Sequence, residues 1–418
     1  MTTHTSPALI AAAGRVRRRV RQFASTASGW LSAAVLTAPL ACDLDVTTSS
    51  RLPAEELDSP AAAALLVNGG AADLTCALGA WTVVSGLVSG ELNDATQTAA
   101  RWSYDRRVID PGETRYSQEA CEAIGVYTPL QTARYTNDNA LTKLQAWTDE
   151  QVSDRQEKIA QTAAYAGFAT LLLGEGFCEA PAVALGPALT QAQLFQRAEE
   201  YFGTALTAAT AAAAVDLQRL AYAGRARAHL NQGELADAGA DAANVPADFD
   251  YKLATSATPG RLQNRVYAEN NQGASVNIGQ AYRDEALFPV DSIDPILRRS
   301  GDQRQLWLQT KYTGLTDSLI LSSGAQTQLI AQEAAGTDPI ATIIELRRRQ
   351  LFLEGTRMFD LQRFNVPGTS QLVPLLPAPG TQYPFQGQAK GGTYGDLGGN
   401  RCMPLPDLER LNNPNIDG

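Results

Sequence analysis

The chain has 418 residues, of which 44% are hydrophobic and 19% are charged, and its formal net charge is −10. This composition excludes a disordered chain and a protein with many membrane spans, and the length is ample for a large hydrophobic core. All five basic residues before Cys42 lie in a stretch without acids, so the remaining chain is five units more negative, at −15. We expect no nucleic-acid partner, because nucleic-acid phosphates require a basic surface.

The first 41 residues have the features of a secretory signal. Five arginines between residues 15 and 21 precede the apolar run 30–41, which is too short to span a bilayer. Cys42 follows this run directly, as a lipidated cysteine does, although Pro39 stands where leucine is usual. We expect lipidation of Cys42 and then a polar linker over 42–60. The alternative is an ordinary cleaved signal, with Cys42 as a plain thiol.

Helical patterns dominate the residues up to 245. Apolar residues recur at helical spacing, and small residues such as Gly167 and Gly224 would let neighbouring helices approach closely. The stretch 223–246, with Gly233 at its turn, is similar to a tetratricopeptide helix-turn-helix, a unit that stacks on its neighbours. The polar stretch 93–111 has no clean period and predicts a loop. The expected helical segments cover 61–67, 71–91, 122–146 and much of 155–243.

Four cysteines follow Cys42, and an even number in an exported chain favours disulfides. Their spacing fits no zinc motif. Of the three possible pairings we expect Cys76–Cys121, which would join two early helices, and Cys178–Cys402, which would hold the C-terminal tail. Four buried free thiols are the alternative.

The stretch 338–364 predicts a charged amphipathic helix that is interrupted at Gly355. Asp338 and Pro339 suit its first turn, and Glu345 stands four residues before Arg349, the favoured order for a helical ion pair. Its charges could simply form a solvated face. We expect instead that they hold the helix to its neighbours and form no binding site.

This stretch resembles the C-terminal signature of the SusD/RagB family of nutrient-capturing outer-membrane lipoproteins. Gln350 and Met358 depart from the usual Glu and Trp of that signature. The residues 403–406 (MPLP) and 412–415 (NNPN) are similar to the family's C-terminal ending. The positions that match the signature are Glu345, Arg347, Arg348, Glu354, Gly355, Arg357, Phe359, Asp360, Leu361 and Arg363.

The resemblance implies an all-α fold, in which a right-handed tetratricopeptide-like scaffold carries long irregular loops that face ligand and partner. It implies a single domain over 61–418, with the tetratricopeptide-like helices mainly within 61–245 and a loop-rich part with the signature over 246–418. Tyr135 and Asn139 resemble an early family motif whose Asn would be a structural hydrogen bonder.

The function that this resemblance implies is nutrient capture at the cell surface. The protein would be anchored in the outer membrane by its lipid, bind an oligosaccharide or a peptide, and deliver it to a SusC-like TonB-dependent transporter. Asp43, directly after Cys42, leaves open whether the lipoprotein is retained at the inner membrane or exported to the surface.

The sequence contains no set of residues with a catalytic pattern. His229 is the single histidine after Cys42, and we expect it to pack or to face solvent. The zinc-protease, phosphate-loop and serine-hydrolase motifs are absent. Glycoside hydrolysis needs only two carboxylates, but Glu354 and Asp360 fall within the structural signature. We therefore predict no enzyme, no cofactor and no metal site.

Ligand binding is the better hypothesis, and the polar, aromatic stretch 93–111 offers the residues for it. Sugars present apolar faces to aromatic rings and hydroxyls to polar side chains. The candidates are Asp94, Arg101, Trp102 and Tyr104. The alternative is that Trp102 and Tyr104 only pack the loop onto a helix. Further aromatic candidates, more often core anchors, are Trp307, Tyr312, Tyr383 and Phe385.

Two other functions remain possible from the sequence. A tetratricopeptide-like lipoprotein could hold other envelope proteins together without binding a nutrient. An envelope glycosidase would need a carboxylate pair that the sequence does not single out.

Overall fold

The computed structural model describes residues 54–96, 99–279, 282, 290–293, 305–364 and 400–416. The described residues form one compact unit. The predicted signal, Cys42 and most of the predicted linker lie outside the described residues, as do Tyr383 and Phe385. The end of that linker is already part of the fold: Ala54–Leu57 forms helix α1, and the Lys143 ammonium lies 2.5 Å from the Asp58 carboxylate.

The central element is a single long helix where the sequence suggested two segments. Helix α2 runs from Ala63 to Ser89 and ends at Gly90, whose φ of 78° is a left-handed conformation that glycine adopts readily. By length and composition, Pro60–Ser89 is the one helical stretch among the described residues that could cross a membrane, and 83% of its most apolar part is buried inside the protein. The helix is therefore apolar all round because other elements surround it.

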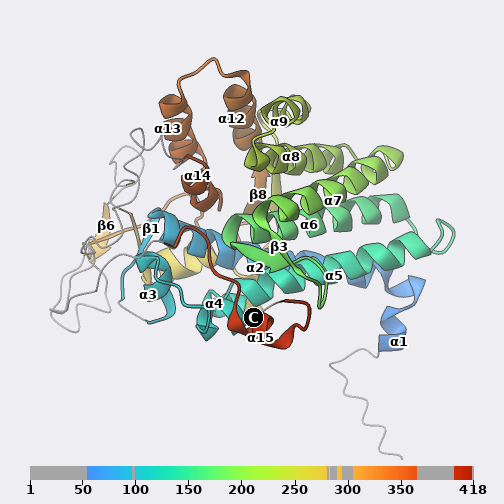
Figure 1. Ribbon diagram of the computed structural model, residues 1–418, viewed down its shortest axis with the longest axis horizontal. Helices are drawn as coiled ribbons and strands as arrows, with labels where there is room; N and C mark the ends of the chain where they lie inside the picture. Colours follow the sequence, from blue (N-terminus) through green and yellow to red (C-terminus); the bar gives the residue numbers. More distant parts are fainter. Residues whose placement is uncertain are drawn as a thin grey trace, which may run out of the picture. The chain divides into compact units, whose positions relative to one another are not determined.

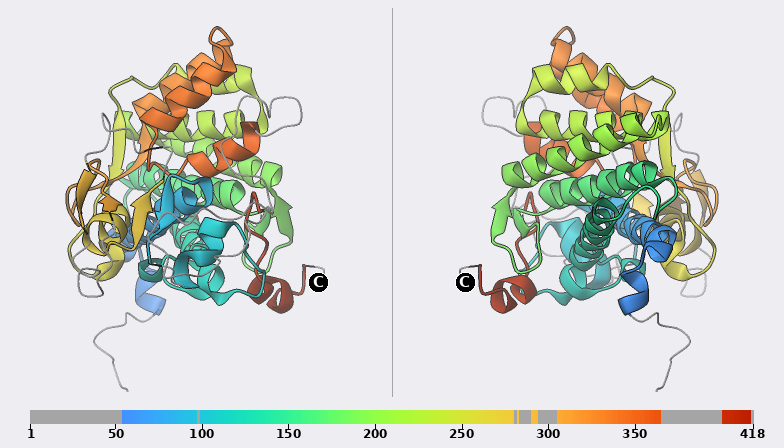
Figure 2. Two further views of the ribbon diagram at one scale, coloured as in Figure 1. Left: turned by 90° about the vertical axis from the view of Figure 1, so that its left-hand side faces the viewer. Right: turned by 90° about the vertical axis from the view of Figure 1, so that its right-hand side faces the viewer.

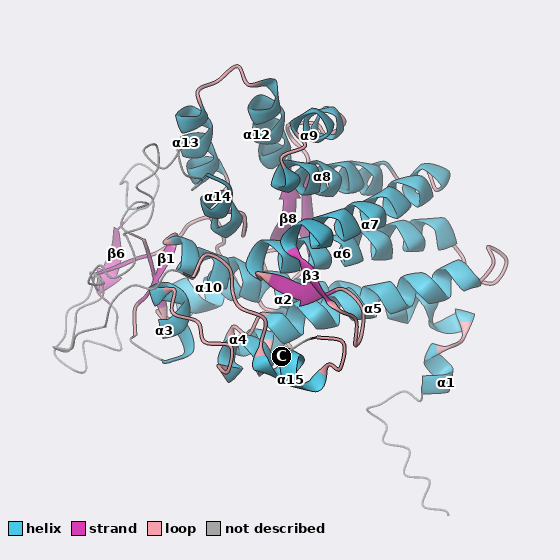
Figure 3. Cartoon of the chain, viewed as in Figure 1, coloured by secondary structure: helices cyan, strands magenta, loops and turns pink. Residues whose placement is uncertain are grey.

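The helices after α2 form a stack in which each packs on the next (Figure 1). Two views from the sides show the same layered order (Figure 2). Helices far outweigh strands in the described residues (Figure 3), so the all-α fold class is confirmed. The stacked helices are α5 (Tyr127–Ala146), α6 (Arg155–Gly176), α7 (Gln191–Ala211), α8 (Val215–Gln232) and α9 (Leu235–Ala242).

Small residues set the close spacing of this stack, as the sequence predicted. The ring of Phe202 on α7 lies between Gly167 of α6 and Gly224 of α8. A Cβ atom at Gly224 would stand 2.3 Å from this ring, and one at Gly167 would stand 2.7 Å from it. No room for a side chain exists at either position, so both glycines are needed for the helix–helix contact.

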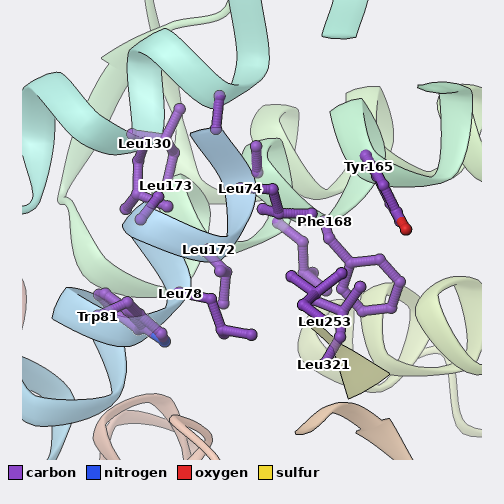
Figure 4. Packing of buried hydrophobic residues seen from close by; sticks show 14 of the residues in the cluster. Leu74, Leu78, Trp81, Leu130, Tyr165, Phe168, Leu172, Leu173, Leu253 and Leu321 are labelled. Atoms are coloured by element: carbon purple, nitrogen blue, oxygen red, sulfur yellow. The ribbon is translucent and has the colours of Figure 1, made fainter. Parts of the chain in front are cut away.

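The hydrophobic core lies between α2, the stack and two strands (Figure 4). Trp81 of α2 is fully buried, and Phe168 of α6 packs edge-on against Phe202 at 5.1 Å between ring centroids. Burial of such large apolar side chains is the main stabilising contribution to the fold. Other residues of this core are Leu74, Leu78, Leu130, Tyr165, Leu172, Leu173, Leu253 and Leu321.

The strands are short and form antiparallel pairs. They join distant parts of the chain to the scaffold and build no larger sheet among the described residues. The pairs are β1 (Leu92–Asp94) with β5 (Val276–Ile278), β2 (Glu179–Pro181) with β3 (Ala188–Thr190), β4 (Asp250–Leu253) with β8 (Leu319–Ser323), and β6 (Val290–Ile293) with β7 (Gln305–Trp307).

Several shorter helices complete the described part. The expected loop over 93–111 contains a strand and a helix, so that prediction was wrong in part, and the helix expected from residue 122 begins only at Tyr127. The shorter helices are α3 (Ala99–Arg106), α4 (Thr114–Gln118), α10 (Arg265–Tyr267), α12 (Gly324–Ala335), α13 (Ile340–Gln350), α14 (Arg357–Phe364) and α15 (Asp407–Asn412).

The signature stretch forms α13 and α14 with a sharp turn between them. Gly355 stands in this turn with φ of 72°, and its carbonyl accepts a hydrogen bond from the Trp81 indole at 2.9 Å. The predicted pair of Glu345 with Arg349 is present at 2.5 Å. Asp338 makes no described cap for α13, which begins after Pro339. The turn is thus fixed on Trp81 of α2, and α14, which follows it, packs on α2.

Buried ion pairs hold this helical corner together. Asp360 accepts from Arg347 at 2.8 Å and from Arg363 at 3.1 Å, and Arg363 also pairs with Glu333 of α12 at 2.7 Å. On the stack side, Arg227 of α8 pairs with Glu175 of α6. The signature residues Arg347, Asp360 and Arg363 thus contact one another and α12, as expected of helices that are held to their neighbours by ion pairs.

The structure pairs Cys76 with Cys121 and Cys178 with Cys402, as the sequence analysis expected. The first bridge joins α2 to the 3-10 turn before α5. The second joins the end of α6 to the C-terminal segment, where Met403 also forms a bridge with Phe177. Both disulfides therefore connect elements that are far apart along the chain.

The structural asparagine of α5 is Asn137 and not Asn139. Asn137 is fully buried and donates to the carbonyl oxygens of Gly70 and Ala133 at 3.0 and 2.8 Å. Asn139 is only half-buried. The expected role therefore belongs to a residue two positions earlier, whose side chain faces α2.

Candidate functional site

Helix α3, at the lower left of Figure 1, carries three of the four predicted ligand-binding residues. Its sequence alone would not hold a helix of eight residues in place. Asp105 anchors it to β1: one carboxylate oxygen accepts from the backbone N–H of Asp94 at 2.8 Å, and the other from the Asn93 amide at 3.1 Å. The tertiary contact, not a helical period, thus defines this segment.

Asp94 and Arg101 serve the architecture around this helix. Asp94 is buried, and its carboxylate accepts from the backbone N–H and the hydroxyl of Thr96 at 2.9 and 3.0 Å, which shapes the turn after β1. Arg101 reaches from α3 to Glu269, with a closest N–O distance of 2.5 Å. Both side chains of that pair are largely buried, so the pair ties α3 to the segment after α10.

Tyr104 faces the core and is 2% exposed, so it has no free ring face for a sugar. Its hydroxyl donates to the Ile124 carbonyl at 3.1 Å, and burial raises the pKa of the phenol well above its usual value. The expectation that Tyr104 contacts ligand is therefore corrected. The residue packs α3 onto the scaffold, which was the alternative interpretation.

Trp102 alone among the four candidates presents a large side chain to solvent, with 38% of its surface exposed. The guanidinium of Arg106, one turn further along α3, lies over the indole at 5.0 Å from the ring centroid. Val108, just beyond the helix, is 43% exposed. The surface formed by Trp102 and Arg106, here called the α3 platform, combines an aromatic plane and a cation.

A pocket of about 290 Å³ lies beside the signature helix α13. Tyr282 stacks on Phe352 with 5.1 Å between ring centroids, and the guanidinium of Arg348 lies 5.0 Å from the centre of the Tyr282 ring. Lys311 is also part of the wall, where its ammonium pairs with Glu354 at 2.6 Å. This pocket could accept a small ligand with an anionic or hydroxyl-rich edge.

Glu354 and Asp360, the carboxylates that could suggest a glycosidase, are both engaged in ion pairs with other side chains. Glu354 pairs with Lys311 and accepts from the Ser323 hydroxyl at 2.8 Å, and Asp360 is held by two arginines. Both are buried. A general acid or nucleophile must reach the substrate, so neither residue suits that role.

No protein-family model matches the sequence, and no curated protein matches it. The fold, in contrast, is similar to solved structures over most of both chains. A SusD superfamily protein from Bacteroides vulgatus has a TM-score of 0.62 at 13% identity, with coverage of 86% of this chain and 98% of its own. A SusD-like carbohydrate-binding protein from the same organism has a TM-score of 0.61 at 14% identity, with coverage of 86% and 97%.

The chain has the SusD-superfamily fold. A third structure, a laminarin-binding SusD-like protein, has a TM-score of 0.59 at 14% identity and covers 84% of this chain and 97% of its own. The tetratricopeptide-like fold class expected from the sequence is thereby confirmed. The short C-terminal signature was a better guide to the fold than overall identity.

Within this SusD fold, sequence reasoning missed the residues that position the α3 platform. Asp105 lies inside the stretch that was considered, but nothing in its spacing showed that it would bind β1. Glu269 lies 168 residues from Arg101, its partner. The pocket residues Tyr282, Lys311 and Phe352 are also scattered along the chain. A single sequence contains no signal for contacts of this kind.

Proposed function

We propose that this protein captures an oligosaccharide at the cell surface and delivers it to a TonB-dependent outer-membrane transporter. Lipidated Cys42 would anchor it, and a peptide is the alternative cargo. The observation that carries the proposal is the similarity of the fold to a SusD-like carbohydrate-binding protein, with a TM-score of 0.61 over 86% of this chain and 97% of that one. The similar laminarin-binding protein supports the same class of ligand.

The α3 platform supplies the chemistry for such a ligand. The flat indole of Trp102 can stack on the C–H face of a pyranose ring, and Arg106 can donate to its hydroxyls. Asp105 and Arg101 hold the helix rigidly through β1 and Glu269, so the ring is presented with little loss of backbone freedom. We therefore place the first contact with the glycan at Trp102.

Binding is tested by isothermal titration calorimetry with a panel of soluble oligosaccharides, including β-glucans and α-glucans. Trp102→Ala should weaken binding of the recognised glycan by about tenfold or more, because stacking and apolar contact are lost. Tyr135→Ala is the control, since Tyr135 is an exposed aromatic residue on α5, at 52% exposure against 38% for Trp102. If Trp102→Ala and Tyr135→Ala bind the glycan with equal affinity, the binding site does not include Trp102 and lies elsewhere than on α3.

Delivery is tested by a mild-detergent pulldown of the tagged protein from its native membrane, with mass spectrometry of the eluate. A stoichiometric TonB-dependent barrel supports the capture role. Recovery of several envelope proteins without a barrel would replace it by the scaffold function. Turnover of an oligosaccharide that is lost on changing one carboxylate would instead favour a glycosidase.

A further inference from the structure

His229 lies in the last turn of α8, next to Glu199 of α7 and Asp241 of α9. Its Nδ1 atom is 2.6 Å from a carboxylate oxygen of Glu234 and 3.4 Å from one of Glu199. One ligand atom from each of the three side chains lies within 4.8 Å of the other two. Their side chains are 16%, 45% and 22% exposed for His229, Glu234 and Glu199, so ions can reach the group.

The backbone prearranges two members of this group. Residues five apart on a helix do not share a face, but Gly233 ends α8 with φ of 80° and reverses the chain. The backbone N–H of Glu234 then donates to the His229 carbonyl at 2.9 Å. This turn brings the Glu234 side chain back beside the imidazole, and no flexible loop is needed to form the pair.

The other imidazole nitrogen faces a carboxylate that is itself fixed. Nε2 of His229 is 3.7 Å from Asp241 of α9, and Asp241 is buried and bound by two nitrogens of Arg225 at 2.6 and 2.7 Å. A carboxylate behind one nitrogen favours a proton there and leaves the lone pair on the other. Histidines that bind metals typically have such a carboxylate partner. Without a metal, Nδ1 donates its proton to Glu234; an ion at Nδ1 would displace that proton, and Asp241 would then hold the remaining proton at Nε2.

The charges around the imidazole favour a cation. The carboxylates of Glu199, Glu234 and Asp241 surround the imidazole. Among the described residues, the cation in direct contact with these carboxylates is Arg225, which forms an ion pair with Asp241. The Gln232 amide donates to one oxygen of Glu199. A divalent ion between the carboxylates would relieve their repulsion.

We propose that Glu199, His229 and Glu234 bind a divalent transition metal ion of the zinc type. Nδ1 of His229 and one oxygen from each glutamate are the protein ligands, and water takes the fourth position. Asp241 positions the imidazole without touching the ion. The bound ion ties α7 to the turn between α8 and α9, and this site is independent of the α3 platform.

The sequence analysis predicted no metal site, and His229 and Glu199 are thirty residues apart in the chain. Only the packing of α7 on α8 brings them together. The other group of metal-type side chains in the described residues contains Cys76 and Cys121, which are joined in a disulfide and so do not offer thiolates.

The test uses the full-length protein, stripped with a chelator and titrated with Zn²⁺ by calorimetry. We expect one Zn²⁺ per chain, and at least a hundredfold weaker binding in Glu199→Gln and in Glu234→Gln. Glu200→Gln is the matched control, because Glu200 is the next residue on α7 and pairs with Arg197 outside the group. Unchanged affinity in the two glutamine variants, or no binding by the wild type, overturns the proposal.

Two further readouts separate a metal site from simple ion pairing. The imidazole ¹⁵N resonances of His229, assigned with His229→Gln, should show Zn²⁺ at Nδ1 and a proton at Nε2. Zn²⁺ should also raise the melting temperature of the wild type and of Glu200→Gln, but not of Glu199→Gln. If the resonances show a doubly protonated ring that does not respond to Zn²⁺, the group is a set of ion pairs only.

Discussion

Arg347 and Asp360 form an ion pair at 2.8 Å in which each side chain is only 3% exposed. They lie on α13 and α14, on the two sides of the turn at Gly355. Burial alone would raise the pKa of Asp360, but Arg347 and Arg363 outweigh it and hold this pKa below its usual value. The corner of the fold thus depends on a charge that is removed from water.

Loss of this charge should destabilise the protein strongly. Asp360→Asn keeps the shape of the side chain but leaves Arg347 and Arg363 without their shared anion. We expect a loss of about 3–5 kcal/mol in the free energy of unfolding, measured by urea denaturation. Glu345→Gln, which breaks an exposed pair of the same signature, should cost less than about 1 kcal/mol. Similar losses for the two variants would show that burial does not matter here.

Stability should depend on pH through Glu91, which follows α2 and is fully buried. Burial raises its pKa to about 7, although the Leu353 N–H donates to it and Arg357 and Lys311 lie near. Because the folded state holds this proton more tightly than the unfolded state, the stabilisation is present at low pH. It is lost as the pH rises from about 4.5 to about 7.

Glu91→Gln removes that dependence while it keeps an oxygen to accept from Leu353. The difference in unfolding free energy between variant and wild type should therefore change by roughly 3 kcal/mol between pH 4.5 and pH 7.5, in favour of the variant at the higher pH. Chemical denaturation at both pH values measures this change. Parallel pH profiles for the two proteins would mean that Glu91 titrates normally.

Gly224 and Gly203 provide a matched pair of glycines on neighbouring helices. Gly224→Ala places a methyl group 2.3 Å from the Phe202 ring and should cost about 1–3 kcal/mol. In Gly203→Ala the new methyl group would have no neighbouring atom within 4 Å. This variant should be more stable by roughly 0.5–1 kcal/mol, because alanine favours the helix over glycine. Thermal unfolding should thus shift in opposite directions, and shifts of the same sign would contradict the close contact.

The sequence predicted what local spacing determines. The ion pair of Glu345 with Arg349 follows from helical geometry, and the tight contacts at Gly167 and Gly224 follow from residue size. Both pairings of the four cysteines after Cys42 were expected, although spacing did not decide between the alternatives. Asn137 was missed because Asn139, four residues after Tyr135, is the asparagine that resembles the family motif, and only the position of α2 decides which of the two is buried.

The candidate ligand site was harder to predict for the same physical reason. Trp102 and Tyr104 are two residues apart on α3, so they face opposite sides of the helix. One side packs on the scaffold and the other faces solvent. The sequence contains both aromatic residues but not the direction from which the scaffold approaches. Helix α3 is only eight residues long and is held in place by Asp105 and by the pair of Arg101 with Glu269. Its presence could therefore not be inferred from the spacing of apolar residues.

Cys178 and Cys402 are 224 residues apart in the sequence, so their disulfide closes a large covalent ring. The ring contains α7, α8, α9 and the whole signature. A protease that cuts the backbone anywhere inside this ring leaves two pieces that stay covalently joined. Such a nicked molecule would migrate as one species on a non-reducing gel and separate only after reduction. A protein of this design can be cleaved once within the ring and still keep every described helix covalently attached to α2.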